Sequence, residues 1–187
     1  HRHRPAARAR PGGAGAAHHL PHPGARLWTG APLTGRRTGA PLNPIPRFGD
    51  RRRTRIGLLG GSFNPAHAGH LHVAELARTR LRLHQVWLLV SPGNPLKPAA
   101  GMAALAVRLA SAGAIADGRR IVATDIEARI GTRYTADTLR LLRRRFPRVQ
   151  FVWLMGADNL AQLPRWREWR CIVADVVIAV LPRPTYN

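Results

Sequence analysis

The stretch Arg55–Leu71, RIGLLGGSFNPAHAGHL, predicts a strand that turns sharply into a helix. Its apolar run Ile56–Leu59 suits a buried strand, which the following glycines and Pro65 should end. From Gly69 onward, apolar residues recur at the spacing of one helical face. Backbone N–H groups at the start of a helix lack partners within it, and the helix dipole adds partial positive charge there. The turn is therefore suited to bind an anion.

Two histidines, His67 and His70, lie in this turn with Gly69 between them. Taken alone, the pair could simply cap and pack the start of a helix. Beside Gly60 and Gly61, which allow close approach of a ligand to the backbone, the pair points to a site that handles phosphate. Imidazole N–H groups aimed at phosphate oxygens would stabilise the charge of a transition state.

The rest of the chain alternates predicted strands with predicted helices. Further strands are predicted at 85–91, 120–126, 149–155 and 175–181, and helices at 102–116 and 135–146. This alternation predicts an α/β fold with a parallel, doubly wound sheet and right-handed crossovers. Ligands of such sheets bind beyond the carboxyl ends of the strands. The glycine turn, the loop that holds Lys97 and the turn at Gly156–Asp158 all follow strands, so we expect them to share one crevice.

Composition divides the chain in two. Its 187 residues carry a net charge of +21 and suffice for one domain. Residues 1–54 are rich in Pro, Gly, Ala, Arg and His and poor in large apolar side chains, which predicts a disordered extension before a domain at 55–187. The basic extension could contact nucleic acid or an acidic membrane, but an extension without specific function is the simpler interpretation.

Cysteine usage and hydropathy exclude several classes of protein. The single cysteine, Cys171, excludes an internal disulfide framework, and no Cys/His spacing typical of a metal cluster occurs. No apolar run approaches the roughly 20 residues that span a bilayer. We therefore expect a cytoplasmic protein without a membrane partner.

Four motifs resemble a known enzyme family, in the family's order. The segment GGSFNPAHAGHL, with His67-Ala68-Gly69-His70, is similar to the signature of the nucleotidyltransferases that carry a His-x-Gly-His tetrapeptide. Residues 133–139 (RYTADTL), 156–159 (GADN) and 163–166 (LPRW) resemble segments of bacterial nicotinate-nucleotide adenylyltransferases. The resemblance implies a Rossmann-like sheet of the nucleotidyltransferase type. It also implies transfer of the adenylyl group of ATP to nicotinate mononucleotide, which gives deamido-NAD and pyrophosphate in NAD biosynthesis.

The resemblance also assigns roles to residues. It implies catalytic roles for His67 and His70 at the α-phosphate and for Lys97 at the mononucleotide phosphate. ATP and its phosphates would be bound by Gly60, Gly61, Ser62, Phe63, Gly156 and Asp158, and nicotinate mononucleotide by Asn64, Tyr134, Thr135 and Trp166. Helix N-terminal amides and a threonine hydroxyl suit the nicotinate carboxylate, and an indole suits stacking on a flat heterocycle. Mg²⁺ would accompany ATP, held mostly by phosphate oxygens and water, with no dedicated protein metal site.

Other functions stay open from the sequence. A Ser/Thr-rich segment ending in Arg follows the last strand in the family, and no such pattern occurs after Trp166, so we expect a C-terminally truncated domain. The chain could thus be an inactive remnant. It could also be a sister nucleotidyltransferase that acts on phosphopantetheine or glycerol phosphate. A basic module that binds nucleic acid through its tail and the arginines of residues 140–145 is a further alternative, and a homo-oligomer is possible.

Overall fold

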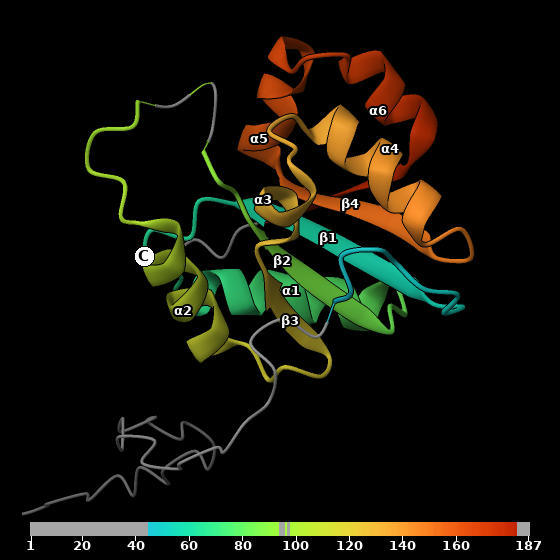
Figure 1. The fold of residues 1–187 in the computed structure, drawn as a ribbon, viewed down its shortest axis with the longest axis horizontal. Helices are drawn as coiled ribbons and strands as arrows, with labels where there is room; N and C mark the ends of the chain where they lie inside the picture. Colours follow the sequence, from blue (N-terminus) through green and yellow to red (C-terminus); the bar gives the residue numbers. More distant parts are fainter. Residues whose placement is uncertain (1–44, 94–95, 97, 183–187) are drawn as a thin grey trace, which may run out of the picture. The chain divides into compact units, whose positions relative to one another are not determined.

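The computed structural model describes residues 45–93, 96 and 98–182, which form a layered α/β domain (Figure 1). Its sheet has five parallel strands in the order β3-β2-β1-β4-β5. The strands are β1 (Arg55–Gly61), β2 (Gln85–Val90), β3 (Ile121–Thr124), β4 (Gln150–Gly156) and β5 (Val177–Leu181). The strand order reverses between β1 and β4, so the predicted doubly wound sheet is confirmed.

Helices cover both faces of this sheet. They are α1 (Ala68–Arg80), α2 (Leu105–Ile115), α3 (Ile126–Ile130), α4 (Thr135–Arg145), α5 (Ala157–Gln162) and α6 (Trp169–Asp175), with a 3₁₀ turn, η1, at Leu163–Arg165. The buried apolar residues of α1 and α2 belong to one hydrophobic cluster, and those of α3, α4 and α6 belong to another. The helices of the two clusters lie on opposite faces of the sheet (Figure 1).

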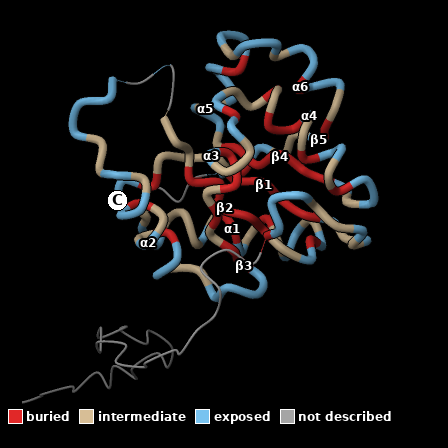
Figure 2. Tube along the Cα trace, in the orientation of Figure 1, coloured by how far each residue is buried: buried red, intermediate tan, exposed pale blue. Residues whose placement is uncertain are grey.

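Alternation along the strands assigns each side chain to one of these two clusters. In β2, Trp87 and Leu89 pack with the cluster of α3, α4 and α6, whereas Val86 and Leu88 pack with that of α1 and α2. Successive side chains of a strand point to opposite faces, so a strand covered on both sides must be apolar throughout. The central strands are accordingly the most deeply buried part of the domain (Figure 2). Each fully buried Leu, Val or Ile contributes about 1.5–3 kcal/mol.

At three places a strand end differs from the prediction by two residues, and the other strand ends agree to within one residue. Gly60 and Gly61 continue β1 instead of ending it, because both stay paired with β2. Ile126 begins α3 instead of ending β3, and its backbone N–H donates to the Thr124 hydroxyl (3.1 Å). Asp175 ends α6 instead of beginning β5. All three are boundary errors of two residues, which leave the order of elements unchanged.

Residues 45–54, which composition assigns to the disordered extension, pack against the domain. The side chain of Ile45 is 1% exposed and belongs to the cluster of α3, α4 and α6. The carbonyl of Arg47 accepts a hydrogen bond from Arg145 at the end of α4 (2.6 Å). Gly49, at φ +82°, lies so close to the Arg145 backbone that a Cβ there would overlap it. The folded domain therefore includes residues on the amino-terminal side of the predicted boundary at 54.

Candidate functional site

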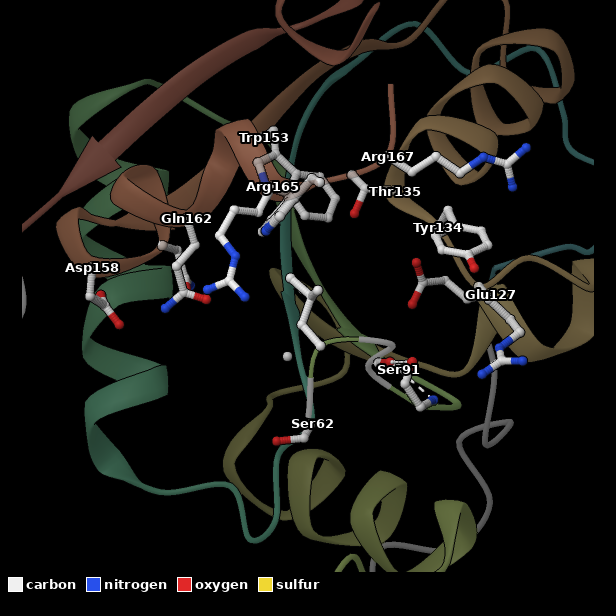
Figure 3. Close-up of a pocket in the computed structure, with 17 residues that line it drawn as sticks. Ser62, Ser91, Glu127, Tyr134, Thr135, Trp153, Asp158, Gln162, Arg165 and Arg167 are labelled. Atoms are coloured by element: carbon white, nitrogen blue, oxygen red, sulfur yellow. Dashed lines mark hydrogen bonds between the residues drawn. The ribbon is translucent and has the colours of Figure 1, made fainter. Parts of the chain in front are cut away.

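A pocket of about 360 Å³ opens at the carboxyl ends of β1 and β4. This is the point where the strand order reverses, and parallel sheets place their ligands there. The lining residues come from the ends of β1, β2 and β4, the start of α4, and the α5–η1 segment (Figure 3). They are Gly60, Gly61, Ser62, Ser91, Gly93, Leu96, Glu127, Arg133, Tyr134, Thr135, Trp153, Asp158, Asn159, Gln162, Arg165, Trp166 and Arg167. The crevice predicted from strand order therefore exists, and it combines the glycine turn, the start of α4 and the region after β4.

Two tryptophans form the apolar part of the pocket. Trp153 of β4 is 3% exposed, and its ring meets that of Trp166 edge to face, with centroids 6.1 Å apart. A Cβ on Gly60 would lie 3.0 Å from the Trp153 ring, so a glycine is needed there for the ring to approach β1. An aromatic wall of this kind suits an aromatic ring of a ligand.

The start of α4 forms the facing polar wall. Tyr134 precedes the helix in an extended conformation and supplies no side-chain cap, so the first backbone N–H groups of α4 are not capped by it. Thr135 follows as the first helical residue, and its hydroxyl lies in the pocket (Figure 3). The guanidinium of Arg167 lies 4.8 Å from the centre of the Tyr134 ring. Helix amides, a hydroxyl and a nearby cation together suit a bound carboxylate.

The pocket carries more positive than negative side chains. Arg133, Arg165 and Arg167 line it together with two acidic residues, Asp158 and Glu127. Burial raises the pKa of Glu127 to about 7, although a hydrogen bond from Thr138 lowers it in part. A cavity whose charged side chains are mostly cationic attracts anionic ligands.

His67 and His70 lie at the other end of the same β1–α1 turn and shape the start of α1. His67 is the N-cap, and its Nδ1 accepts from the Gly69 N–H (3.2 Å). The Nδ1 of His70 accepts in turn from the His67 N–H (3.2 Å), which completes a reciprocal capping box. The two rings are 3.9 Å apart between centroids. Because both Nδ1 atoms accept, we assign the ring hydrogen of each neutral imidazole to Nε2.

Gly69 makes this arrangement possible. A Cβ at position 69 would lie 3.0 Å from two atoms of the His67 ring. The spacing His-x-Gly-His therefore has a steric reason, because the small residue lets the first ring fold over the first turn. Both capping and the family role predicted for the histidines are compatible with this geometry, since the caps use only Nδ1.

Several predicted site residues do not line the pocket. The two imidazoles are outside its wall, and the Phe63 side chain is buried in the core, with its ring 4.8 Å from that of His70. Asn64 is tied to the loop before α2, where it donates to Gly101 O (2.9 Å) and accepts from Ala103 N (3.2 Å). Gly156 ends β4 one residue before α5 and two before Asp158. Lys97 lies outside the described residues.

Other lining residues were not predicted from the sequence. Arg165 and Arg167 flank Trp166, so their proximity to the site could have been read from the motif itself. Ser91 follows β2 directly and could have been found by the rule that placed the glycine turn. Glu127 gives no such signal, because its burial depends on α4, which follows it in the chain.

The described residues contain neither a metal-binding cluster nor a membrane-spanning helix. Within residues 45–93, 96 and 98–182, no three His, Cys, Asp or Glu side chains are grouped so that they could hold a metal ion. Over the same ranges, each helix is too short or too polar to pass through a bilayer.

Comparison with known proteins gave consistent matches. The family model described as cytidylyltransferase-like matches residues 58–186. A protein of Gluconacetobacter diazotrophicus named "Probable nicotinate-nucleotide adenylyltransferase" is 67% identical over 146 residues, which are 78% of this chain and 68% of that protein. A protein of the same name from Gluconobacter oxydans is 71% identical over 130 residues, or 70% and 67% of the two lengths.

Solved structures agree with the fold. The nicotinic acid mononucleotide adenylyltransferase of Plasmodium falciparum, solved in complex with NaAD, superposes with a TM-score of 0.58 at 17% identity, covering 72% of this chain and 78% of that one. At this identity the match supports the architecture alone. From the family model and the close relatives together, we conclude that the chain belongs to the cytidylyltransferase-like family, alongside bacterial proteins named as nicotinate-nucleotide adenylyltransferases.

Proposed function

We propose that this protein transfers the adenylyl group of ATP to nicotinate mononucleotide, forming deamido-NAD and pyrophosphate. The observation that carries the proposal is the composition of the pocket at the β1/β4 switch point. There the glycine turn of β1 faces the uncapped start of α4 and the indole of Trp166. The names of the relatives that share 67–71% identity with the chain support the same reaction.

The acceptor would bind in this pocket. The pyridine ring would lie against Trp166, with its carboxylate at the backbone N–H groups and hydroxyl of Thr135, next to Tyr134. These groups suit a planar anion, because the indole provides contact area and the helix start provides N–H donors. Arg133 and Arg165 add positive charge for the phosphate of the mononucleotide.

The reaction would be one in-line displacement. A phosphate oxygen of nicotinate mononucleotide attacks the α-phosphorus of ATP, and the bond from that phosphorus to the bridging oxygen of the β-phosphate breaks, so pyrophosphate leaves. No general base is required, because the second pKa of a phosphate monoester is near 6 and the attacking oxygen is already anionic at pH 7. The protein has to position two anions and reduce their repulsion.

The histidines would act at the α-phosphate. With each Nδ1 engaged in the helix cap, His67 and His70 would present Nε2–H to phosphate oxygens on which charge increases in the transition state. Gly60, Gly61 and Ser62 would let the nucleotide approach the backbone, and Asp158 would accept hydrogen bonds from ribose. We retain Lys97 as the proposed partner of the acceptor phosphate. Mg²⁺ would enter on the phosphates of ATP, where it shields their charge.

Comparison of three acceptors, each assayed separately, tests the proposal. Pyrophosphate release is measured with ATP and, in turn, nicotinate mononucleotide, phosphopantetheine and glycerol phosphate. We expect release with the pyridine mononucleotide only, and deamido-NAD as the second product. Release with one of the other acceptors alone would make the protein a sister nucleotidyltransferase. Absence of release with all three would contradict the proposal.

A further inference from the structure

One carboxyl group of the pocket has no role in the reaction described above. Glu127 lies on α3, directly after β3, and is 7% exposed. Its carboxyl group nevertheless reaches the pocket, where it lies beside Tyr134 and across from Thr135 (Figure 3). A buried carboxyl group at the wall of a ligand pocket costs stability. A role in ligand binding would explain the position of Glu127.

A chain of hydroxyl groups connects Glu127 with the start of α4. The Thr138 hydroxyl donates to Glu127 Oε1 (2.9 Å), and it lies 2.8 Å from the Thr132 hydroxyl. The same Thr138 oxygen is 3.2 Å from the carbonyl of Tyr134. Thr138 has a single hydrogen to share among these oxygens. Both the Glu127 carboxyl group and the carbonyl just before Thr135 are within reach of that hydrogen.

The nearby charges do not neutralise Glu127. In the described part of the chain it forms no ion pair, and the arginine of its own helix, Arg129, pairs with Asp125 (3.0 Å). Arg167 is held over the Tyr134 ring and lies 3.8 Å from Asp137. The charged and titratable groups that share the pocket with Glu127 are Arg133 and Tyr134 before α4, Asp158 on α5, and Arg165 and Arg167 around η1. From α4 the Thr138 hydroxyl faces it, and burial is what raises its pKa to about 7.

We propose that Glu127 selects the substituent on the pyridine ring of the acceptor, admitting a carboxylate when it is protonated and favouring a carboxamide when it is ionised. The inference rests on the proposed function, because it takes the pyridine ring to lie between Trp166 and Thr135. A protonated carboxyl group donates a hydrogen bond to the nicotinate carboxylate. An ionised one repels that carboxylate, but it accepts a hydrogen bond from the N–H₂ of nicotinamide.

A binding experiment isolates this effect. Quenching of tryptophan fluorescence, with Trp153 and Trp166 in the pocket wall, reports the dissociation constants of nicotinate and nicotinamide mononucleotide between pH 6 and 8.5. Both ligands carry the same phosphate, so its ionisation cancels in the ratio of the two constants. For the unmodified protein we expect this ratio to shift about tenfold toward nicotinamide mononucleotide as the pH rises. In Glu127→Gln, which keeps the shape without an ionisable proton, the ratio should not change with pH.

Controls separate the possible failures. Glu75→Gln makes the same chemical change on the exposed side of α1 and should keep the pH dependence of the unmodified protein. A ratio that is constant with pH in the unmodified protein overturns the inference, and this measurement needs no variant to fold. A ratio that still changes in Glu127→Gln overturns it as well. Adenylyl transfer is assayed in parallel: turnover of nicotinate mononucleotide with a constant ratio overturns only the selection by Glu127, whereas absence of turnover overturns the proposed function.

Discussion

At the scale of single residues, His67 and His70 each combine a structural bond with a proposed catalytic one. Their Nδ1 atoms stabilise the first turn of α1, and the proposed catalytic bond would use Nε2. One ring nitrogen thus fixes the tautomer of the other, which is how histidines are oriented at many active sites.

Substitution of His67 can separate these two functions. Asparagine is a strong N-cap residue, so His67→Asn should leave the free energy of unfolding nearly unchanged while lowering kcat about 10²–10³-fold. His67→Ala should lose the same turnover and, in addition, about 1 kcal/mol of stability. Steady-state rates and urea unfolding of both variants provide the comparison. Full turnover in His67→Asn would remove this imidazole from the mechanism.

Burial of Glu127 predicts how stability depends on pH. Its pKa rises from 4.5 to about 7 on folding, so the folded state holds the proton more tightly than the unfolded chain. This contribution is favourable in full below pH 4.5 and is lost as the pH rises to 7, a change of about 3 kcal/mol. The Glu127→Gln variant has no ionisable carboxyl group, so this pH-dependent contribution is absent from it. The stability of the variant relative to the unmodified protein should therefore increase from pH 4.5 to 7 and level off above. Urea unfolding at pH 4.5, 6, 7 and 8 measures the difference, and parallel curves for the two proteins would contradict it.

The residues of the site differ in how far the sequence reveals them. Gly60, Gly61, Thr135 and Trp166 lie in local motifs, and the structure places all four in one pocket. Glu127 could not be recognised, since in sequence it is one acidic residue in a short polar segment. Thr138, whose hydroxyl bonds the Glu127 carboxyl group, lies on α4 and reaches it only after the chain has turned into that helix. Asn64 shows the reverse case, because a residue within the motif has its side chain bonded to the loop before α2.

At the scale of elements, α2 is joined to the pocket by a buried arginine. Arg108 is 2% exposed, and it donates to the carbonyls of Ser62 (2.9 Å), Ser91 (2.7 Å) and Ala103 (2.8 Å). Ser62 and Ser91 follow β1 and β2 and both line the pocket. One guanidinium therefore fixes the spacing of two loops that form the site.

Arg108→Met tests this connection. The substitution keeps an apolar stem but leaves three carbonyls without their donor, so we expect a loss of about 3 kcal/mol and a raised KM for the acceptor. Arg80→Met, at the exposed end of α1, is the matched control and should change stability by less than about 0.5 kcal/mol. Denaturant unfolding and steady-state kinetics give both readouts. A KM unchanged from that of the unmodified protein would show that the loops hold their spacing without the guanidinium.

Whether an element could be predicted from the sequence depended on its length. All five strands and the helices α1, α2 and α4 follow from clear apolar patterns. The short helices α3, α5 and α6, of five to seven residues, were not predicted, because a single turn carries too few residues to establish a period. Two of them supply residues of the pocket, which is why the site was predicted less completely than the sheet.

At the scale of the whole domain, the amino-terminal boundary has an energetic consequence. Ile45 fills a place in the core, although it stands between prolines in a stretch whose composition suggests disorder. One apolar side chain among many polar and small ones does not change the composition enough to predict an ordered segment. Its burial in the cluster of α3, α4 and α6 makes it part of the fold.

Two versions of the chain test this boundary. A chain that begins at Ile45 should be more stable than one that begins at Arg55 by about 3 kcal/mol, since the shorter one loses a buried isoleucine and the bond between Arg145 and the Arg47 carbonyl. Urea unfolding of the two chains measures the difference. Ile45→Ala in the longer chain should give an intermediate value. Equal unfolding midpoints for the two chains would show that residues 45–54 do not stabilise the domain, which would then begin after residue 54 as the composition predicts.

The strand order also determines when the domain can form. β1 lies at the centre of the sheet, and its two neighbours are β2, the next strand to be synthesised, and β4, which the ribosome adds only after α4. Until β4 emerges, one edge of β1 has no partner, and a nascent chain with such an exposed edge is prone to associate with others. Stable folding of the sheet, and with it the pocket at the β1/β4 junction, must therefore wait until β4 has left the ribosome.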